Sequence, residues 1–398
     1  MTAPAAGSPR CGVGCSTEAD VVRALETAVA EAAEEIGGGP ADLATVFVSA
    51  GYGSALRPAL EALAEAVPAT VLVGTTAEGV LAGDREHEGG PAVAVWLARL
   101  PTARIVPVSL EYSQTPDGGM FAGWPEALEK PWPDGAALVL LADPFSFPVD
   151  AFLHRMADEH PDVPVIGGMA SGGAGPGGNT LVCGPRTCES GAVGVVLGGG
   201  VRLRPVVSQG CRPIGRPMVI TRAEENLIVE LGGRPALERL REIYGSLDDA
   251  DRRLVRSSLH VGRAASEYRD SFGPGDFLVR NVVGADPESG VIAVGDLVRT
   301  GQTVQFHVRD AASATADLRS LLSAAAGHRR PAGALVFTCN GRGTRLFAEP
   351  DHDARCLREC LGDVPTAGFF AQGEIGPIGG RSFLHGFTAS IALVEARE

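Results

Sequence analysis

An arginine set between two glycines is the first residue in this chain that suggests binding chemistry. Arg342 lies in the segment CNGRGTRLF (339–347), which follows a β-rich run and is therefore expected in a loop at the carboxyl end of a strand. Open α/β sheets bind ligands at such strand ends. A guanidinium has five fixed donors that suit a carboxylate or phosphate. The alternative is a structural arginine that pairs with Glu374 or Asp351 and holds the loop.

A glutamate and a histidine follow in GFFAQGEIGPIGGRSFLHGF (368–387). Glu374 and His385 could form an acid/base pair, line one wall of a binding pocket, or only fasten a C-terminal sheet. A single histidine beside apolar residues is more often part of a core or a turn. A nucleophilic set of Cys339, His385 and Glu374 can also be written, but its members lie on separate loops and no nucleophile elbow supports it.

The elements that must position these residues repeat three times along the chain. Each unit reads as strand, helix, strand, glycine turn and strand, over residues 44–100, 136–200 and 333–395. The turn fits G-x-x-A-x-G in every unit, with the triplets Gly74/Ala77/Gly79, Gly167/Ala170/Gly172 and Gly368/Ala371/Gly373. Two interpretations stay open, a turn that the fold requires and a loop that faces a ligand.

The residue before the last glycine of each turn is polar in an apolar setting. It is Glu78 in the first unit, Ser171 in the second and Gln372 in the third. This recurrence favours a shared functional face.

The remaining segments give the domain organisation. Residues 1–15 are expected to be a mobile start, a helix is predicted over 16–40, and residues 276–310 read as two or three antiparallel strands with turns at DPESG and RTGQ. The predicted fold class is mixed α/β (α+β), with two domains of mixed β-sheets flanked by helices and built from the repeated units. The predicted division is an N-terminal tail and helix at 1–39, an N-terminal domain at 40–225 and a C-terminal domain at 226–398.

Composition excludes several classes of function. The 34 basic and 48 acidic residues give a net charge of −14, which repels nucleic acid and anionic lipid, so neither nucleic acid nor membrane is expected as a partner. The only lysine is Lys130, which rules out a Walker A loop and a Schiff-base cofactor. The eight cysteines form no C-x-x-C motif, and neither a metal nor another cofactor is expected.

The location of the chain is inferred from two further patterns. No run of about 18 to 20 apolar residues is present, and the start lacks the layout of a signal peptide. The protein is expected to be cytoplasmic.

Several of these segments together resemble a known family, the FIST domain, with its N-terminal and C-terminal parts in order. They are VGTTAEGVLAG, VPVIGGMASGG, SQGCRPIGRPMVITRAEENLIVELGGRPALERL, CNGRG, GFFAQGEIGPIGG and LHGFTAS. The resemblance covers the chain from about residue 40 onward and implies a sensory domain for small ligands, possible amino acids among them, in bacterial signal transduction. The same resemblance extends to a domain of eukaryotic F-box proteins that presents a surface to protein substrates. The resemblance implies a functional role for Asn340, Arg342, Gly343, Gln372, Gly373, Glu374, His385 and Thr388.

These observations lead to a prediction with two alternatives. A cytoplasmic sensory protein is expected to bind a small ligand, such as an amino acid, in a pocket between the two FIST parts, with Thr76 and Glu78 added to the residues above. No kinase, cyclase, methyl-accepting or F-box segment is expected, so a protein partner would carry the signalling output. The first alternative is a protein–protein interaction module without a ligand. The second is a hydrolase that uses Cys339 or Glu374, although no enzyme activity is the leading expectation.

Overall fold

A computed structural model describes residues 8–397, except residues 68, 117, 130, 270 and 274. Lys130 therefore lies outside the described residues. The chain divides into two compact units, each described separately here. Unit 1 comprises residues 1–207, 318–384 and 388–398, and unit 2 comprises 208–317 and 385–387. This spatial grouping joins segments that are distant in sequence, and the domain boundaries predicted from the sequence stay predictions.

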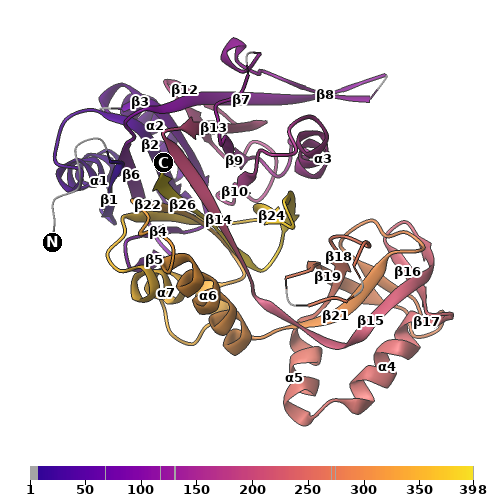
Figure 1. Ribbon diagram of the computed structural model, residues 1–398. Coiled ribbons are helices and arrows are strands. Elements are labelled where there is room, and N and C mark those ends of the chain that lie inside the picture. Colours follow the sequence, from indigo (N-terminus) through magenta and orange to yellow (C-terminus); the bar gives the residue numbers. More distant parts are fainter. Residues whose placement is uncertain are drawn as a thin grey trace. The chain divides into compact units, whose positions relative to one another are not determined.

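The predicted threefold repeat is confirmed in unit 1 (Figure 1). In each repeat the first and second strands pair in parallel and the last strand pairs antiparallel to the first. The first repeat has β2 (Ala41–Ser49), α2 (Leu56–Ala66), β3 (Ala69–Ala77) and β6 (Val93–Arg99). The second has β9 (Ala137–Ala142), α3 (Val149–Glu159), β10 (Val165–Met169) and β13 (Ala192–Gly199). The third has β22 (Gly333–Cys339), α7 (His352–Leu361), β23 (Thr366–Ala371) and β26 (Thr388–Ala396).

Each repeat forms the centre of its own mixed sheet. The sheet orders are β1-β6-β2-β3-β11-β12, β25-β24-β10-β9-β13-β7-β8 and β14-β26-β22-β23-β4-β5. The added strands are β1 (Arg10–Ser16), β4 (Val80–Ala82), β5 (Arg85–His87), β7 (Ala103–Thr115), β8 (Gly118–Ala122), β11 (Leu181–Cys183), β12 (Arg186–Cys188), β14 (Val201–Gln209), β24 (Glu374–Ile378) and β25 (Arg381–His385). The short hairpin of β4 and β5 lies inside the first repeat in sequence, between β3 and β6, but extends the third repeat's sheet.

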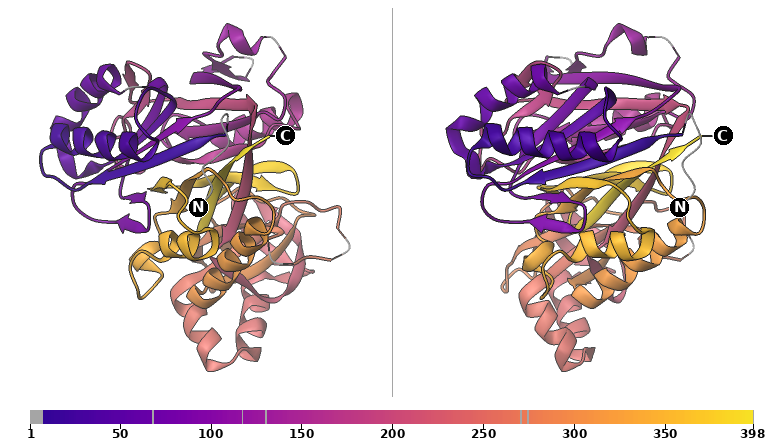
Figure 2. Two further views of the ribbon diagram at one scale, coloured as in Figure 1. Left: turned by 60° about the vertical axis from the view of Figure 1, so that its left-hand side comes forward. Right: turned by 90° about the vertical axis from the view of Figure 1, so that its left-hand side faces the viewer.

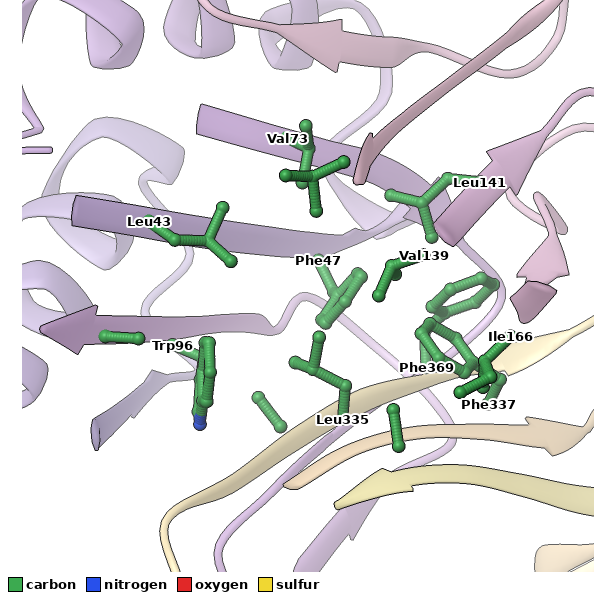
Figure 3. Packing of buried hydrophobic residues seen from close by; sticks show 14 of the residues in the cluster. Leu43, Phe47, Val73, Trp96, Val139, Leu141, Ile166, Leu335, Phe337 and Phe369 are labelled. Carbon is green, nitrogen blue, oxygen red and sulfur yellow. The ribbon is translucent and has the colours of Figure 1, made fainter. Parts of the chain in front are cut away.

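One apolar core joins the three sheets (Figure 3). Phe47 of the first repeat, Val139 of the second and Phe337 of the third belong to the same buried cluster. Helices cover the other faces, which explains why the central strands are buried on both sides and read as continuous apolar runs. Figure 2 shows the N-terminal helix α1 (Val21–Glu35) beside β1.

The expectation of a mobile start over residues 1–15 is wrong for the described part of that segment. Arg10–Ser16 forms β1 and pairs antiparallel with β6. Its glycines allow close contact with the backbone of α1, since a Cβ at Gly14 would lie 2.0 Å from the carbonyl oxygen of Ala28. The helix predicted over 16–40 is present but shorter: α1 covers Val21–Glu35 and begins after the side-chain cap of Asp20, while Ser16 ends β1.

Unit 2 contains the antiparallel strands predicted over 276–310. Its sheet runs β15-β21-β18-β19-β20-β16-β17, and a further pairing of β15 with β16 closes it. The strands are β15 (Cys211–Glu224), β16 (Leu227–Leu231), β17 (Arg234–Pro235), β18 (Leu259–Ala264), β19 (Phe277–Ala285), β20 (Ile292–Val294) and β21 (Thr303–Arg309), with helices α4 (Ala236–Ser246) and α5 (Asp249–Ser258). The helix α6 (Ala311–Ala326) follows β21. The mixed α/β fold class is thus confirmed, and no helix of the described residues is long and apolar enough to cross a membrane.

Candidate functional site

The three glycine turns meet one another inside unit 1. The backbone N–H of Glu78 donates to the hydroxyl of Ser171 (2.9 Å), and that hydroxyl donates to the carbonyl of Phe370. The backbone N–H of Gln372 donates to the carbonyl of Met169 (3.1 Å). The polar positions that recur in sequence therefore gather at one place in space.

The first glycine of each turn has a structural explanation. A Cβ at Gly74 would lie 2.3 Å from the carbonyl oxygen of Val46, and a Cβ at Gly167 or Gly368 would lie 1.9 Å from the matching oxygen of the neighbouring strand. Real side chains never approach backbone that closely, so each repeat requires glycine at this position. The alanines of the motif are fully buried as well. The motif itself thus serves the fold.

A cavity of about 130 Å³ opens where the first and third turns meet the loop after β22. Its lining residues are Glu78, Gly79, Glu88, Asn340, Thr344, Arg345 and Phe370. The first three follow β3 or β5, and the last four follow or end strands of the third repeat. Two predicted site residues, Glu78 and Asn340, line this cavity.

The charged walls of the cavity are held by specific contacts. Both terminal nitrogens of Arg345 contact the carboxylate of Glu78, and Nη1 also donates to the carbonyl of Asn340 (2.7 Å). The carboxylate of Glu88 accepts from the backbone N–H of Thr344 (2.9 Å) and from its hydroxyl (2.8 Å). The Arg345 side chain remains 54% exposed and that of Glu78 35% exposed, so solvent and ligands can reach the pair.

Gly343, another predicted site residue, lies beside the cavity and positions Glu88. Its φ of +55° is in the left-handed region that favours glycine. A Cβ at this position would lie 2.5 Å from the carboxylate of Glu88. The glycine therefore permits the close approach of Glu88 to the loop.

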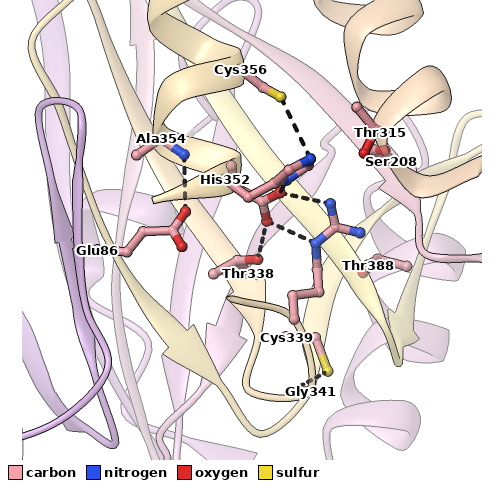
Figure 4. A network of polar contacts seen from close by, with 12 residues as sticks. Glu86, Ser208, Thr315, Thr338, Cys339, Gly341, His352, Ala354, Cys356 and Thr388 are labelled. Atoms are coloured by element: carbon pink, nitrogen blue, oxygen red, sulfur yellow. Dashed lines mark hydrogen bonds and ion pairs between the residues drawn. The ribbon is translucent and has the colours of Figure 1, made fainter. Parts of the chain in front are cut away.

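Arg342 has a different environment from Arg345, although both belong to the same loop. Figure 4 shows Thr338 and His352 of the polar network to which Arg342 belongs. Its guanidinium is 0% exposed and makes two 2.7 Å hydrogen bonds to Asp353 at the start of α7. The structural partner is thus Asp353, whereas Glu374 or Asp351 was the expectation. Burial acts to raise the pKa of Asp353, but the charge and hydrogen bonds of Arg342 outweigh it and hold that pKa well below its usual range.

Further polar groups extend the network around Asp353. Thr338 donates to this carboxylate at 2.6 Å, and Nδ1 of His352 lies 2.9 Å from it. The Nε2 atom of His352 lies 3.9 Å from the sulfur of Cys356, whose pKa burial raises to about 11. A thiol in this state is a poor nucleophile at neutral pH. The network anchors the loop after β22 to the start of α7.

Glu374 forms a second buried group with Thr388. The carboxylate accepts from the backbone N–H (3.0 Å) and the hydroxyl (2.8 Å) of Thr388. Burial raises the pKa of Glu374 to about 8, against the opposing hydrogen bonds from Thr388 and Cys339 and the charge of Arg342. The carboxyl is therefore largely protonated at neutral pH. Cys339 is itself buried and is not among the residues that line the cavity.

The remaining predicted site residues are dispersed. Thr76 is buried in β3, where its hydroxyl accepts from the backbone N–H of Thr180 (2.9 Å). Gln372 is exposed, while the carbonyl of Gly373 accepts from Met169 (2.8 Å). His385 is buried and belongs to unit 2. Sequence reasoning missed Glu88, Thr344, Arg345 and Phe370, although the last three lie inside segments already singled out.

Unit 1 is thus a three-repeat α/β fold with a polar cavity where its first and third turns meet the loop after β22. Comparison with known families identifies the chain: residues 42–234 match the FIST N domain and residues 236–377 match the FIST C domain. The protein belongs to the FIST family. FIST domains are generally thought to be small-ligand sensory domains of signalling proteins.

Relatives of similar length occur in mycobacteria. An uncharacterized protein of Mycobacterium tuberculosis (strain ATCC 25618 / H37Rv) is 44% identical over 386 residues, which cover 96% of this chain and 99% of the relative. An uncharacterized protein of Mycobacterium bovis (strain ATCC BAA-935 / AF2122/97) is 43% identical over 386 residues, covering 96% and 98%. These similarities support the family assignment but name no ligand.

Proposed function

We propose that this protein is a cytoplasmic sensory protein that binds an amino acid or a related small metabolite in the cavity next to Arg345. One observation carries the proposal. The cavity has charged and aromatic walls, and its residues come from both the FIST N segment (Glu78, Glu88) and the FIST C segment (Asn340, Arg345). Small-molecule sites are concave and combine apolar walls with a few convergent polar groups.

The Arg345–Glu78 pair can open for a ligand at small cost. Exposed ion pairs contribute only about 0 to 1 kcal/mol, because water screens them. Both side chains are partly exposed. A ligand that contacts either residue replaces an interaction that is weak in water, whereas opening the buried Arg342–Asp353 pair would leave a charge without its partner.

The residues outside the cavity have supporting roles in this proposal. Arg342 anchors the loop through Asp353, and Gly343 admits Glu88. Glu374 and Thr388 connect β24 to the start of β26 beside Cys339. A separate protein partner would receive the signal.

A thermal-shift screen of amino acids and metabolites tests this function. We expect at least one compound to raise the melting temperature of the wild type in a concentration-dependent way, and to lose that effect in Arg345→Gln and Glu88→Gln variants. Arg155→Gln is the matched control, because Arg155 forms an exposed pair with Glu159 on α3. Stabilisation that is the same in all variants would contradict the proposed cavity. If the protein retains a protein partner from native extract and no compound stabilises it, the interaction module is favoured. If the wild type hydrolyses an ester or amide and the Cys339→Ser variant does not, the hydrolase is favoured.

A further inference from the structure

We propose that the cavity recognises a primary ammonium group, so that its ligand is an organic amine and a carboxylate on that ligand is dispensable. The inference rests on the proposed function, since it concerns the same cavity. It is carried by the charge of the walls, by the contacts that already occupy the positive groups, and by the acceptors that remain.

The walls of the cavity have a net negative charge. They contain one arginine, Arg345, and two glutamates, Glu78 and Glu88, so the formal sum is +1 − 2 = −1. A cationic ligand compensates this charge, whereas an anionic ligand adds to it. The net charge of −14 on the chain acts in the same direction.

The charged donor of the cavity and the donors of Thr344 already hold carboxylates of the protein itself. Arg345 contacts both oxygens of Glu78 and donates to the carbonyl of Asn340. Thr344 directs its backbone N–H and its hydroxyl to Glu88. The carboxylate of Glu88 thus takes the place that a ligand anion would need in this loop.

The acceptors of the cavity suit an ammonium group. Each carboxylate oxygen has more than one lone-pair direction, so Glu78 and Glu88 can accept further hydrogen bonds while they keep their present partners. An ammonium has three donors and no acceptor. Charge-assisted hydrogen bonds of this kind are among the stronger ones in proteins.

The aromatic wall contributes in the same direction. Phe370 lines the cavity directly after the buried Phe369 of β23. A cation near the face of an aromatic ring is attracted by the ring quadrupole, and the attraction grows when water is excluded. The ring also offers an apolar surface to the carbon chain of an amine.

Isothermal titration with three compounds of one scaffold tests the inference on the full-length protein. L-alaninamide presents the ammonium without a carboxylate, N-acetyl-L-alanine presents the carboxylate without an ammonium, and L-alanine presents both. We expect L-alaninamide to bind at least as tightly as L-alanine, and N-acetyl-L-alanine not to bind. In Glu88→Gln and in Glu78→Gln we expect the affinity for L-alaninamide to fall at least about tenfold.

The control variant is Glu159→Gln, which removes an exposed carboxylate on α3 and should leave binding unchanged. Melting curves of each variant verify that the fold is intact. Binding of N-acetyl-L-alanine without binding of L-alaninamide would overturn the inference and leave the proposed ligand site standing. Tenfold tighter binding of L-alanine than of L-alaninamide would also overturn it, because the carboxylate would then be recognised. Binding of none of the three would overturn the inference for this scaffold, while the wider thermal-shift screen decides separately on the proposed function.

Discussion

Two arginines three positions apart in one loop differ in burial and in their ion-pair partners. Arg342 is enclosed with Asp353, and Arg345 lies in an exposed pair with Glu78 at the cavity. A buried pair is costly to break because the remaining charge stays without water, while an exposed pair contributes little. Burial and not residue type thus distinguishes the two arginines, and in the proposed function only Arg345 responds to a ligand.

Substitution of the two arginines should therefore separate stability from binding. We expect Arg342→Ala to lower the free energy of unfolding by about 3 to 5 kcal/mol, because it leaves the Asp353 carboxylate buried without its main partner. Arg345→Ala should change it by at most about 1 kcal/mol. Urea unfolding followed by circular dichroism measures both values. Equal losses would contradict the different roles of the two residues.

The raised pKa of Glu374 makes stability depend on pH. The folded protein holds this proton up to about pH 8, whereas the unfolded chain releases it near the ordinary value of 4.5. The stabilising contribution is therefore complete below pH 4.5 and declines as pH rises toward 8.

A Glu374→Gln variant removes this titration. We expect the stability of the variant relative to the wild type to increase between pH 4.5 and pH 8, by at least about 1 kcal/mol. Urea unfolding at a series of pH values measures the difference between the two proteins, which cancels the titration of all other groups. A difference that does not vary with pH would show that Glu374 titrates normally.

At the scale of elements, the glycine turn of each repeat begins inside the second of the two parallel strands and leads out of it. This strand lies so close to its neighbour that no Cβ fits: a Cβ added at Gly368 would lie 1.9 Å from the carbonyl oxygen of Val336. The fold therefore explains why the motif occurs once in each of three repeats. In the proposed function, ligand specificity comes from cavity residues outside the G-x-x-A-x-G positions, such as Glu78 and Arg345.

Replacement of this glycine tests that explanation. We expect Gly368→Ala to cost at least about 1 to 3 kcal/mol of stability, because the methyl group would force β22 and β23 apart. The control is Gly175→Ala, a glycine with open space around its Cβ position and without a positive φ. Thermal unfolding of the two variants is the measurement. Equal melting temperatures would mean that the strands accommodate the methyl group.

Much of this level of structure could be predicted from the sequence. The apolar periodicity and the glycine turns indicate strands such as β22 and helices such as α3, because these signals are local. The pairing of β4 with β23 could not be predicted, since it joins residues near 80 to residues near 368 and leaves no local pattern. For the same reason the sequence does not indicate Glu88 as a site residue, since its carboxylate accepts a hydrogen bond from Thr344, which is distant in sequence.

At the scale of the whole molecule, the FIST N and FIST C segments follow one another in sequence, whereas each compact unit is made of separate stretches of the chain. Unit 1 takes residues from both FIST segments, and unit 2 is formed largely by residues 208–317. The ends of that insertion meet, because Ser208 donates to the carboxylate of Asp317 (2.8 Å). The boundaries of this insertion fall inside β14 and α6, so a strand leads into it and a helix leads out of it.

The central claim is that the cavity beside Arg345 is the ligand site of this FIST protein. A crystal structure of the protein with the compound that binds most tightly in the thermal-shift screen tests it most directly. We expect electron density in the cavity, with a nitrogen of the ligand within hydrogen-bond distance of Glu78 or Glu88 and its carbon chain against Phe370. Density for the ligand at any other place, with this cavity unchanged, would contradict it.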